Sequence, residues 1–317
     1  MTPGTLWLVS PSYFDAEAYR RLQERVLATL DAQPRPVAER VRFVVADDTG
    51  GLDLELAALA RERDDTILVT PPFNLGHQRA LVFALRNLSQ RMRGGDLVVT
   101  LDADGEDRPE DLPRLLAPLL DSAEHGREIV VAQRTQRRET LPFKGLYLVF
   151  LTIFRGLTGT TMRSGNFAAY SGRTGRTILR HPYFDLCYSS TLVALDLPVK
   201  YIPCPRGERY AGRSRMGYGP LVMHGFRMLT PFTDRIAVRS LIAFSGAFAL
   251  SLALALAAIA IPAVSDEAIP GWAAAGAMAM MVVSLLSVAN ALILFAVFSQ
   301  SRGISLSNLE DDAHGNP

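Results

Sequence analysis

Lysine and cysteine are scarce in this sequence. Lys144 and Lys200 are its only lysines, and Cys187 and Cys204 are its only cysteines. Two cysteines cannot build the disulfide framework of a small secreted fold, so we interpret them as free thiols in a reducing compartment. The net charge of +1 over 317 residues gives no basic footprint for nucleic acid, and no nucleic-acid partner is expected.

Charge is absent from two long stretches near the C-terminus. Apart from the acidic turn PAVSDEAIPG, no charged residue lies between Arg239 and Arg302. Each stretch exceeds the ~20 apolar residues that a helix needs to cross a bilayer, and one central charge would cost roughly 2.5–3.5 kcal/mol there. We predict two transmembrane helices, at 240–261 and 272–298. The alternative is a buried hairpin in a soluble protein.

The arginines around this hairpin predict its orientation. Arg235 and Arg239 precede the first helix, Arg302 follows the second, and the turn between the helices has acids only. The positive-inside rule then predicts a multi-pass protein of the inner or plasma membrane, with the N-terminal domain and both termini in the cytoplasm. The start of the chain, MTPGTLWLVS, has no basic residue and no long apolar run, so no signal peptide is expected.

Small and polar residues inside the predicted helices indicate helix contacts. Ser245, Ala249, Ala253 and Ala257 recur every four residues, which lets another helix approach closely. This stripe serves either the hairpin itself or a homo-oligomer formed through these helices. Asn290 is expected to make an interhelical hydrogen bond.

Short apolar runs alternate with helical patterns over the first two hundred residues. Strands are predicted at 6–9, 41–46, 66–70, 97–101 and 128–133, and helices at about 15–32, 52–63, 77–92 and 109–121. The alternation predicts an α/β fold with a mostly parallel sheet that helices cover on both faces. Ligands of such sheets bind beyond the carboxyl ends of the strands.

Carboxylates follow three of the first four predicted strands. Asp15 follows the first, Asp47 and Asp48 follow the second, and Asp102 and Asp104 follow the fourth. Neither a G-x-G-x-x-G loop nor a Walker loop is present, which argues against a dinucleotide or P-loop site. An acidic edge of this kind suits a divalent cation that bridges to an anionic ligand.

The segment LVVTLDADGEDRPEDL is the most acidic of these strand ends. Side chains two residues apart share a face, so Asp102 and Asp104 can converge, with Glu106 close behind. Carboxylate oxygens favour Mg²⁺ or Mn²⁺, and such an ion would stabilise a diphosphate leaving group. The alternative is that these acids cap a helix or lie in a solvated turn. Asp107 is predicted to be such a cap, before Pro109.

Several motifs resemble a known family. VVADDTG, NLGHQRAL and LDADGEDRPEDLP, in this order and spacing, resemble family 2 glycosyltransferases of the GT-A fold. Closer still is the polyprenyl-phosphate branch, which includes dolichyl-phosphate mannose synthases and undecaprenyl-phosphate glucosyltransferases. RGERYAGRSRM resembles that branch's R-x-x-R-x-x-G-x-S-[KR] element. The resemblance covers roughly residues 5–235, and the C-terminal helix pair fits it.

The resemblance implies a role for each matching residue. The donor nucleotide would be bound by Pro11, Tyr13, Asp15, Asp47, Asp48, Gly76 and Asp102. The metal on the donor diphosphate would be held by Asp102, Asp104 and Glu106. Donor and acceptor phosphates would meet Arg134, Arg137, Lys144, Arg206, Arg209, Ser214 and Arg215. The catalytic positions would be Asp104, Arg209 and Asn166, while His77 is expected to start a helix near the diphosphate. For the basic stretch QRTQRR, the alternatives are an exposed loop or attraction to anionic lipid headgroups.

Two departures from the branch pattern stand out. The branch reads roughly DADLQDPPE, and here Gly105 and Glu106 stand in place of Leu and Gln. The branch also usually carries G-D-F-R-L, whereas this chain has SGNFAAY, in which Asn166 replaces the Asp and Ala168 replaces the Arg. The second departure weakens a catalytic role for that pair.

Two stretches are expected to connect the N-terminal domain with the bilayer. Residues 143–157 are apolar on nearly every face and form either an interfacial helix or a core helix. Residues 218–239 mix apolar bulk with arginines and are typical of an interfacial helix. The expected divisions are a catalytic domain at 1–205, an acceptor loop and juxtamembrane helix at 206–239, two transmembrane helices at 240–299 and a tail at 300–317.

The resemblance implies an inverting transferase that moves a sugar from a nucleotide-diphosphate donor to a polyprenyl phosphate on the cytoplasmic face of the bilayer. One alternative is a processive polysaccharide synthase. That group carries Q-x-x-R-W, but Trp7 and Trp272 do not follow an arginine. The other alternative is a non-catalytic membrane scaffold that retains a nucleotide-sugar pocket, which Asn166 and Ala168 favour.

Overall fold

The computed structural model describes residues 3–121, 127–135, 141–162, 164–210, 218–260 and 271–300. The chain divides into two compact units. Unit 1 consists of Met1–Leu148 and Met162–Pro231, and unit 2 consists of Val149–Thr161 and Phe232–Pro317. Residues 206–231 therefore cluster with the α/β part, and the second half of helix α5 (Leu141–Thr158) clusters with the C-terminal helices.

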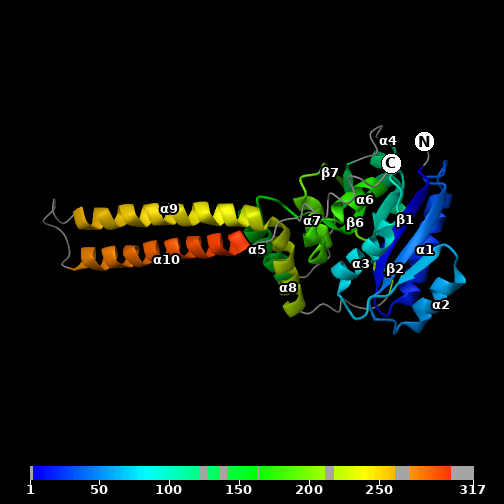
Figure 1. Ribbon diagram of the computed structural model, residues 1–317, viewed down its shortest axis with the longest axis horizontal. Coiled ribbons are helices and arrows are strands. Elements are labelled where there is room, and N and C mark those ends of the chain that lie inside the picture. Colours follow the sequence, from blue (N-terminus) through cyan, green and yellow to red (C-terminus); the bar gives the residue numbers. More distant parts are fainter. Residues whose placement is uncertain are drawn as a thin grey trace. The chain divides into compact units, whose positions relative to one another are not determined.

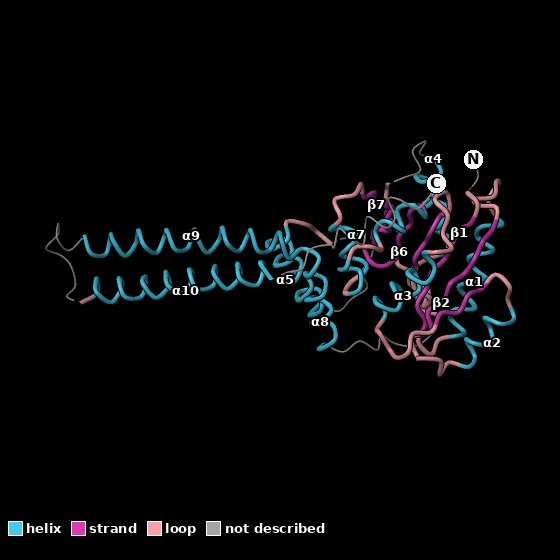
Figure 2. The backbone as a smooth tube through the Cα atoms, in the orientation of Figure 1, coloured by secondary structure: helices cyan, strands magenta, loops and turns pink. Residues whose placement is uncertain are grey.

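Unit 1 contains a seven-stranded sheet with the order β3-β2-β1-β4-β6-β5-β7. Figure 2 shows strands of this sheet in magenta, with the helices of the unit in cyan. The strands are β1 Thr5–Ser12, β2 Arg40–Asp47, β3 Thr66–Val69, β4 Leu97–Thr100, β5 Ile129–Arg134, β6 Ser164–Ser171 and β7 Val199–Cys204. β6 runs antiparallel to β4 and β5, and the other pairings are parallel. The five predicted strands and the mostly parallel sheet are confirmed. β6 and β7 were not predicted.

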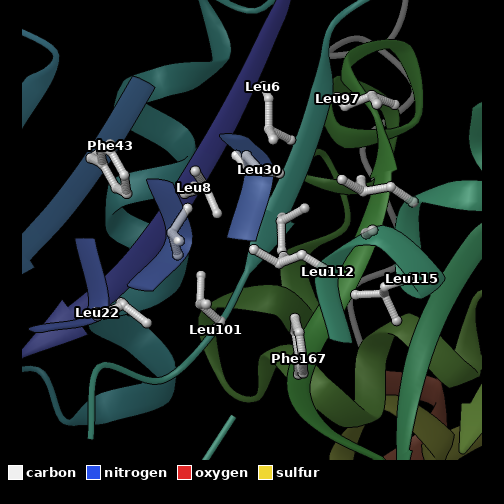
Figure 3. Close-up of a cluster of buried hydrophobic side chains, with 14 of the residues drawn as sticks. Leu6, Leu8, Leu22, Leu30, Phe43, Leu97, Leu101, Leu112, Leu115 and Phe167 are labelled. Atoms are coloured by element: carbon white, nitrogen blue, oxygen red, sulfur yellow. The ribbon is translucent and has the colours of Figure 1, made fainter. Parts of the chain in front are cut away.

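Helices cover both faces of the sheet, as predicted. They are α1 Ala16–Asp31, α2 Leu54–Glu62, α3 His77–Ser89, α4 Leu112–Asp121, α6 Gly172–Ile178 and α7 Tyr188–Ala194. Leu6 and Leu8 of β1 pack with α1, α2 and α4 (Figure 3), while Trp7 and Val9 pack with α3, α6 and α7. This alternation follows from the two-residue repeat of a strand.

The strand order places the end of β4 at the centre of the sheet. From β1 the chain moves outward through β2 to β3, and then returns to β4 on the other side of β1. The crevice beyond the carboxyl ends of two strands that diverge in this way is where open α/β sheets bind ligands. The acidic segment that follows β4 therefore starts at this switch point.

Helix α8 (Tyr218–Leu229) ends where a short 3-10 turn, Thr230–Phe232, begins. Helix α9 (Thr233–Ala260) follows without a break at residue 240. The sequence predicted an interfacial helix over 218–239 that leads into the membrane helix beginning at 240. The observed interruption lies earlier because Pro231 lacks the N–H that a continuous helix needs.

Contacts within unit 2 join the end of α5 to the start of α9. The rings of Phe154 and Phe232 pack edge to face, 5.5 Å apart, and Phe154 is fully buried. Arg239 donates from Nη1 to the carbonyl of Gly156 at 3.1 Å. Ile153, beside Phe154, is exposed, so this part of α5 has one packed face and one open apolar face.

Helices α9 and α10 (Trp272–Gln300) lie side by side (Figure 1) and are each long and apolar enough to cross a membrane. Their contact face includes Ser251 and Ser284, whose hydroxyls lie 2.5 Å apart. The predicted small-residue stripe, Ser245 to Ala257, is exposed and is not this contact face. Asn290 donates to Leu286 O of its own helix at 2.8 Å, so the predicted interhelical bond is wrong.

Candidate active site

Four carboxylates lie within the six residues 102–107 after β4, and two of them fold this loop. Asp107 accepts a hydrogen bond from the backbone N–H of Asp102 at 2.9 Å, and Asp104 accepts one from the backbone N–H of Glu106 at 3.0 Å. The prediction that Asp107 caps the next helix is wrong. Its side chain is 3% exposed and points back to the start of the loop.

Arg134, at the end of β5, reaches three of these acids. Its guanidinium lies 3.1 Å from Asp107, 3.5 Å from Glu106 and 3.8 Å from Asp102. β4 and β5 are both antiparallel to β6, so they are parallel to each other and their carboxyl ends share one edge of the sheet. The sheet topology therefore brings the predicted phosphate-binding arginine against the predicted metal-binding acids.

The segment 206–210 crosses over the same loop. Gly207 donates its N–H to the carbonyl of Glu106 at 2.9 Å, and Tyr210 donates to the carbonyl of Asp104 at 2.9 Å. Gly105 has φ +90°, and a Cβ there would lie 2.8 Å from the ring of Tyr210. A Cβ on Gly207 would lie 2.1 Å from the carbonyl oxygen of Gly105. Only glycines allow the two backbones to approach so closely.

Two arginines of this crossing segment bind the acids beneath it. Arg209 contacts Asp104 through Nη2 at 2.8 Å and Glu106 through Nε at 2.9 Å. Arg206 contacts the other oxygen of Glu106 at 2.7 Å. The match of RGERYAGRSRM to the family element thus corresponds to a direct contact with the acidic loop.

His77 and Asn166 approach the loop from another side. His77 Nε2 lies 2.8 Å from Asp102 Oδ1, and the amide nitrogen of Asn166 lies 3.0 Å from the same oxygen. Gln78 fixes the amide of Asn166: its Oε1 accepts from the backbone N–H of Ser189 at 3.1 Å, so its nitrogen donates to Asn166 Oδ1. Asn166 therefore turns its N–H groups toward Asp102.

The predicted nucleotide-binding residues form a second cluster at the ends of β1 and β2. Asp48 accepts from the backbone N–H groups of Leu75 at 2.7 Å and Gly76 at 3.0 Å. Asp47 accepts from Thr49, and its second oxygen is buried. Since His77 follows Gly76, the start of α3 connects this cluster with Asp102.

The first strand supplies the other predicted nucleotide-binding residues. Pro11 is buried within β1, whereas Tyr13 is 45% exposed just beyond it. Asp15 stands at the N-terminus of α1, and its side chain makes no capping hydrogen bond. The aromatic surface at Tyr13 is available to stack against a planar ligand.

Opposing charges shift the pKa values of these acids in different directions. Burial opposes the charge of Asp102, but His77 and Arg134 outweigh it and hold its pKa well below the usual value. Burial and the nearby charge of Asp102 raise the pKa of Asp104, and they raise the pKa of Asp107 to about 7. The carboxylate of Asp102 raises the pKa of His77, whose side chain is 42% exposed.

Asp102 and Asp104 fit a cation better than Glu106 does. Within the described ranges, no group of three His, Cys, Asp or Glu side chains is placed to hold a metal ion. Glu106, the predicted third ligand, is instead surrounded by the guanidiniums of Arg134, Arg206 and Arg209. Asp104, whose pKa is raised by burial and by the charge of Asp102, meets one arginine rather than three and remains chemically suited to a cation.

Arg137, Ser214 and Arg215, three of the predicted phosphate-binding residues, lie outside the described residues, and so does the side chain of a fourth, Lys144 on α5. Sequence reasoning missed Gln78 and Tyr210 as members of the site. The motif NLGHQRAL was a signal for His77, but no sequence signal identified Gln78 as the residue that orients Asn166.

The α/β sheet has acids and arginines at its switch point and carries neither a dinucleotide nor a P-loop motif, which fits a protein that binds an anionic ligand there by other means. The family model described as "Glycosyl transferase family 2" matches residues 9–184. This match covers more than half of the chain, and the chain belongs to that family.

Relatives of the chain carry a more specific name. The undecaprenyl-phosphate 4-deoxy-4-formamido-L-arabinose transferase of Salmonella paratyphi A is 24% identical over 293 residues, which cover 87% of this chain and 81% of that protein. The protein of the same name from Edwardsiella ictaluri is 24% identical over 286 residues, covering 87% and 82%.

A solved structure shows the same fold. Glucosyl-3-phosphoglycerate synthase from Mycobacterium tuberculosis, crystallised with Mn²⁺, uridine-diphosphate-glucose and phosphoglyceric acid, has a TM-score of 0.50 and 17% identity to this chain. The match covers 74% of this chain and 80% of that one. The α/β unit thus has a GT-A-like fold, followed by two apolar helices that could span a membrane.

Proposed function

We propose that this protein is a membrane-anchored inverting glycosyltransferase that moves a sugar from a nucleotide-diphosphate donor to a polyprenyl phosphate. The observation that carries the proposal is the contact between acids and arginines at the end of β4, where Arg209 joins Asp104 and Glu106. Acids suit a cation on the donor, and arginines suit phosphate. The names of the relatives, which specify undecaprenyl phosphate, support this acceptor class.

The reaction would be a single displacement. A phosphate oxygen of the acceptor attacks the anomeric carbon of the donor sugar, and the bond from that carbon to the diphosphate breaks. The nucleoside diphosphate leaves with the bonding electrons, and the configuration at the anomeric carbon inverts. The guanidiniums of Arg134, Arg206 and Arg209 would offset the phosphate charge through planar, directional N–H groups.

The acceptor phosphate needs no general base. A phosphomonoester has a second pKa near 6, so most of it is already a dianion at neutral pH. Asn166 therefore suits a phosphate acceptor even though relatives of this branch usually carry Asp. In the structure, Asn166 donates to Asp102, which fits an orienting role.

A divalent cation, Mg²⁺ or Mn²⁺, would be held on the donor diphosphate by Asp104, with Asp102 beside it. Mg²⁺ commonly uses one or two protein carboxylates together with substrate phosphates, so two acids are enough. The ion would supply charge neutralisation of the leaving diphosphate. The Mn²⁺ in the M. tuberculosis structure supports a cation here.

Donor and lipid assays test this proposal. Membranes containing the protein are incubated with undecaprenyl phosphate and radiolabelled UDP- or GDP-sugars, with Mn²⁺ or with EDTA. We expect one donor to label an organic-extractable lipid in a metal-dependent way. Label in an insoluble polymer would favour a processive synthase, and no label from any donor would favour the non-catalytic scaffold.

The catalytic domain and both termini are proposed to face the cytoplasm, because arginines flank the hairpin and acids fill its turn. Ser265→Cys, in a turn outside the described residues, should react with an impermeant thiol reagent on intact cells. Ala32→Cys, exposed on unit 1, is the control and should react only after lysis. The native cysteines are buried, which keeps the background low. The reverse pattern would invert the topology.

A further inference from the structure

Glu106 binds more arginines than any other acid of the β4 loop. One of its oxygens lies 2.9 Å from Arg209, and the other lies 2.7 Å from Arg206 and 3.5 Å from Arg134. Its side chain is 11% exposed, compared with 34% for Arg209 and 28% for Arg206. The carboxylate thus lies behind the guanidiniums, and the guanidiniums are closer to solvent.

The contacts of Arg209 fix its guanidinium at two points. Nε meets Glu106 and Nη2 meets Asp104, so two acids hold one planar group. These contacts engage two of the five N–H groups that a guanidinium carries. A guanidinium held in this way keeps donors for a further anion, and its orientation is set before the anion arrives.

The backbone of the crossing segment is built onto the same loop. This segment hydrogen-bonds to the backbone carbonyls of Asp104 and Glu106, and it passes close to the loop at Gly105 and Gly207. These contacts place Arg206 and Arg209 against the acids. Tyr210 is held in turn by Arg25, which donates to its hydroxyl at 2.9 Å. The arginines are therefore presented by a fixed segment.

A cation at Glu106 would lie among three guanidiniums, and like charges repel. A glutamine here would offer one acceptor oxygen, and its NH₂ group would face a guanidinium donor. The charge of Glu106 matches a role in holding arginines.

We propose that Glu106 is a positioning residue whose carboxylate orients Arg206 and Arg209 to bind phosphate oxygens of the substrates. The inference rests on the proposed function, because that function supplies the phosphates. It assigns to Glu106 a role other than the metal ligand that the sequence predicted.

Binding measurements on the full-length protein in detergent separate these roles. The variant is Glu106→Gln, and the probes are Mn²⁺ alone, UDP in EDTA, and farnesyl phosphate, a short lipid phosphate. We expect at least a tenfold loss of affinity for UDP or farnesyl phosphate, and a change of less than about twofold for Mn²⁺. The phosphate probe that is affected identifies the donor or the acceptor as the source of the phosphate.

Glu17→Gln is the matched control. Glu17 also pairs with two arginines, Arg20 and Arg21, but on the exposed surface of α1. Surface pairs of this kind contribute little, so this variant should bind all three probes as the native protein does. A loss shared by both variants would reflect a general effect of removing charge and would overturn the inference.

A combined variant tests whether Glu106 acts through the arginines. If it does, adding Glu106→Gln to a protein that already carries Arg206→Gln and Arg209→Gln should weaken phosphate binding by no more than about twofold. Additive losses would overturn the inference, as would a selective loss of Mn²⁺ affinity or unchanged binding of every probe. If Glu106→Gln does not fold, Arg206→Gln replaces it, and phosphate binding equal to the native protein's would overturn the inference.

Failure of the inference about Glu106 and failure of the proposed function give different results. A native protein that binds farnesyl phosphate but transfers no sugar would refute the proposed function, and the binding data would still decide the role of Glu106. A native protein that binds neither phosphate probe would overturn the inference itself.

Discussion

The polar side chains of the loop after β4 and those of the α9–α10 helix pair have different kinds of partners. In the loop, Asp104 and Glu106 are bound by arginines from a segment about a hundred residues away in the chain. In the helix pair, Ser251 bonds Ser284 of the facing helix, and Asn290 bonds its own turn. The loop concentrates charge where partners of opposite sign surround it, and the helix pair contains no charge after Arg239.

This difference indicates which changes each region tolerates. Removal of one charge from the loop leaves the oppositely charged side chains around it unpaired and partly buried, which lowers the stability of the fold. Insertion of a charge into the helix pair finds no partner at all.

The largest effect is expected for Asp104→Ala. It removes a carboxylate that we assign to the cation, so transfer should fall at least ~10³-fold, equivalent to ~4 kcal/mol in the barrier. The variant should still fold and insert. Single-turnover transfer is measured with Asp121→Ala, an exposed acid of α4, as the control. Full activity of the native protein in EDTA, together with an unharmed Asp104→Ala, would contradict the assignment.

Ser284→Arg should destabilise the helix pair. The side chain of Ser284 is 8% exposed and faces Ser251, and a charge at a helix centre costs roughly 2.5–3.5 kcal/mol. The inserted fraction, or the thermal midpoint in detergent, should fall clearly. Ser284→Ala loses only the hydroxyl contact, which averages ~0.6 kcal/mol in membranes. Equal behaviour of the two variants would argue that α9–α10 is not in a bilayer.

Arg209→Lys should lower turnover by roughly ten- to a hundredfold, about 1.4–2.7 kcal/mol in the barrier. Lysine keeps the charge, but a single ammonium cannot reproduce the fork that contacts Asp104 and Glu106. Transfer rates with saturating donor measure the effect. Turnover at the native level in Arg209→Ala would refute a role for this guanidinium.

Asp107 should make stability depend on pH. Burial and Asp102 raise its pKa to about 7, whereas an unfolded carboxyl ionises near pH 4. Between these values the unfolded chain loses its proton first, so stability falls as the pH rises through this range. Asp107→Asn should lose this part of the slope in thermal midpoints from pH 4 to pH 8.

Asp65→Asn is the control, because Asp65 should change the pH dependence of stability in the opposite direction to Asp107. Arg63 lies 2.6 Å from Asp65 and lowers its pKa, so its contribution to stability is present above pH 4 and is lost as the pH falls. Removal of Asp65 should therefore lower stability at pH 8 more than at pH 4. An unchanged slope in Asp107→Asn would show that the carboxyl ionises normally.

The smallest effect on activity is expected for Asn166→Asp. General-base help is typically worth ~10²–10⁴ in rate, and a phosphate acceptor does not need it. The change in single-turnover rate should therefore stay below about tenfold. Asn87→Asp, on the exposed side of α3, is the control. A gain of a hundredfold or more would mean that the native site lacks a base, and the scaffold or a different acceptor would then be the better account.

The central strands could be predicted because their sequences are simple. β1, β2 and β4 are apolar runs that are buried on both faces, and these runs stood out against the helical patterns around them. β6 has the sequence SGNFAAYS, whose small and polar residues give no such signal. Its place between β4 and β5 is set by pairing with strands distant in the chain, which no local pattern records.

The members of the site were easier to predict than their partners. The acids after β4 and the arginines at 206 and 209 were identified by motif, and the structure brings them together. The sequence could not show that Glu106 faces arginines, because that depends on how a segment about a hundred residues away crosses the loop. It also could not show that Gln78 turns the amide of Asn166, since that geometry needs α3, β6 and α7 in place.

Because Gly105 and Gly207 lie in close contact, the loop after β4 and the segment 206–210 can be replaced by a relative's sequence only if both are replaced together. A relative's D-A-D-L-Q sequence placed here would put leucine at residue 105, where a Cβ already lies 2.8 Å from Tyr210 and 2.9 Å from the carbonyl of Glu208. The leucine would displace the 206–210 segment from the loop unless that segment were taken from the same relative. Chimeras that alter substrate choice should therefore carry both stretches together, and recombination between them should be tolerated poorly.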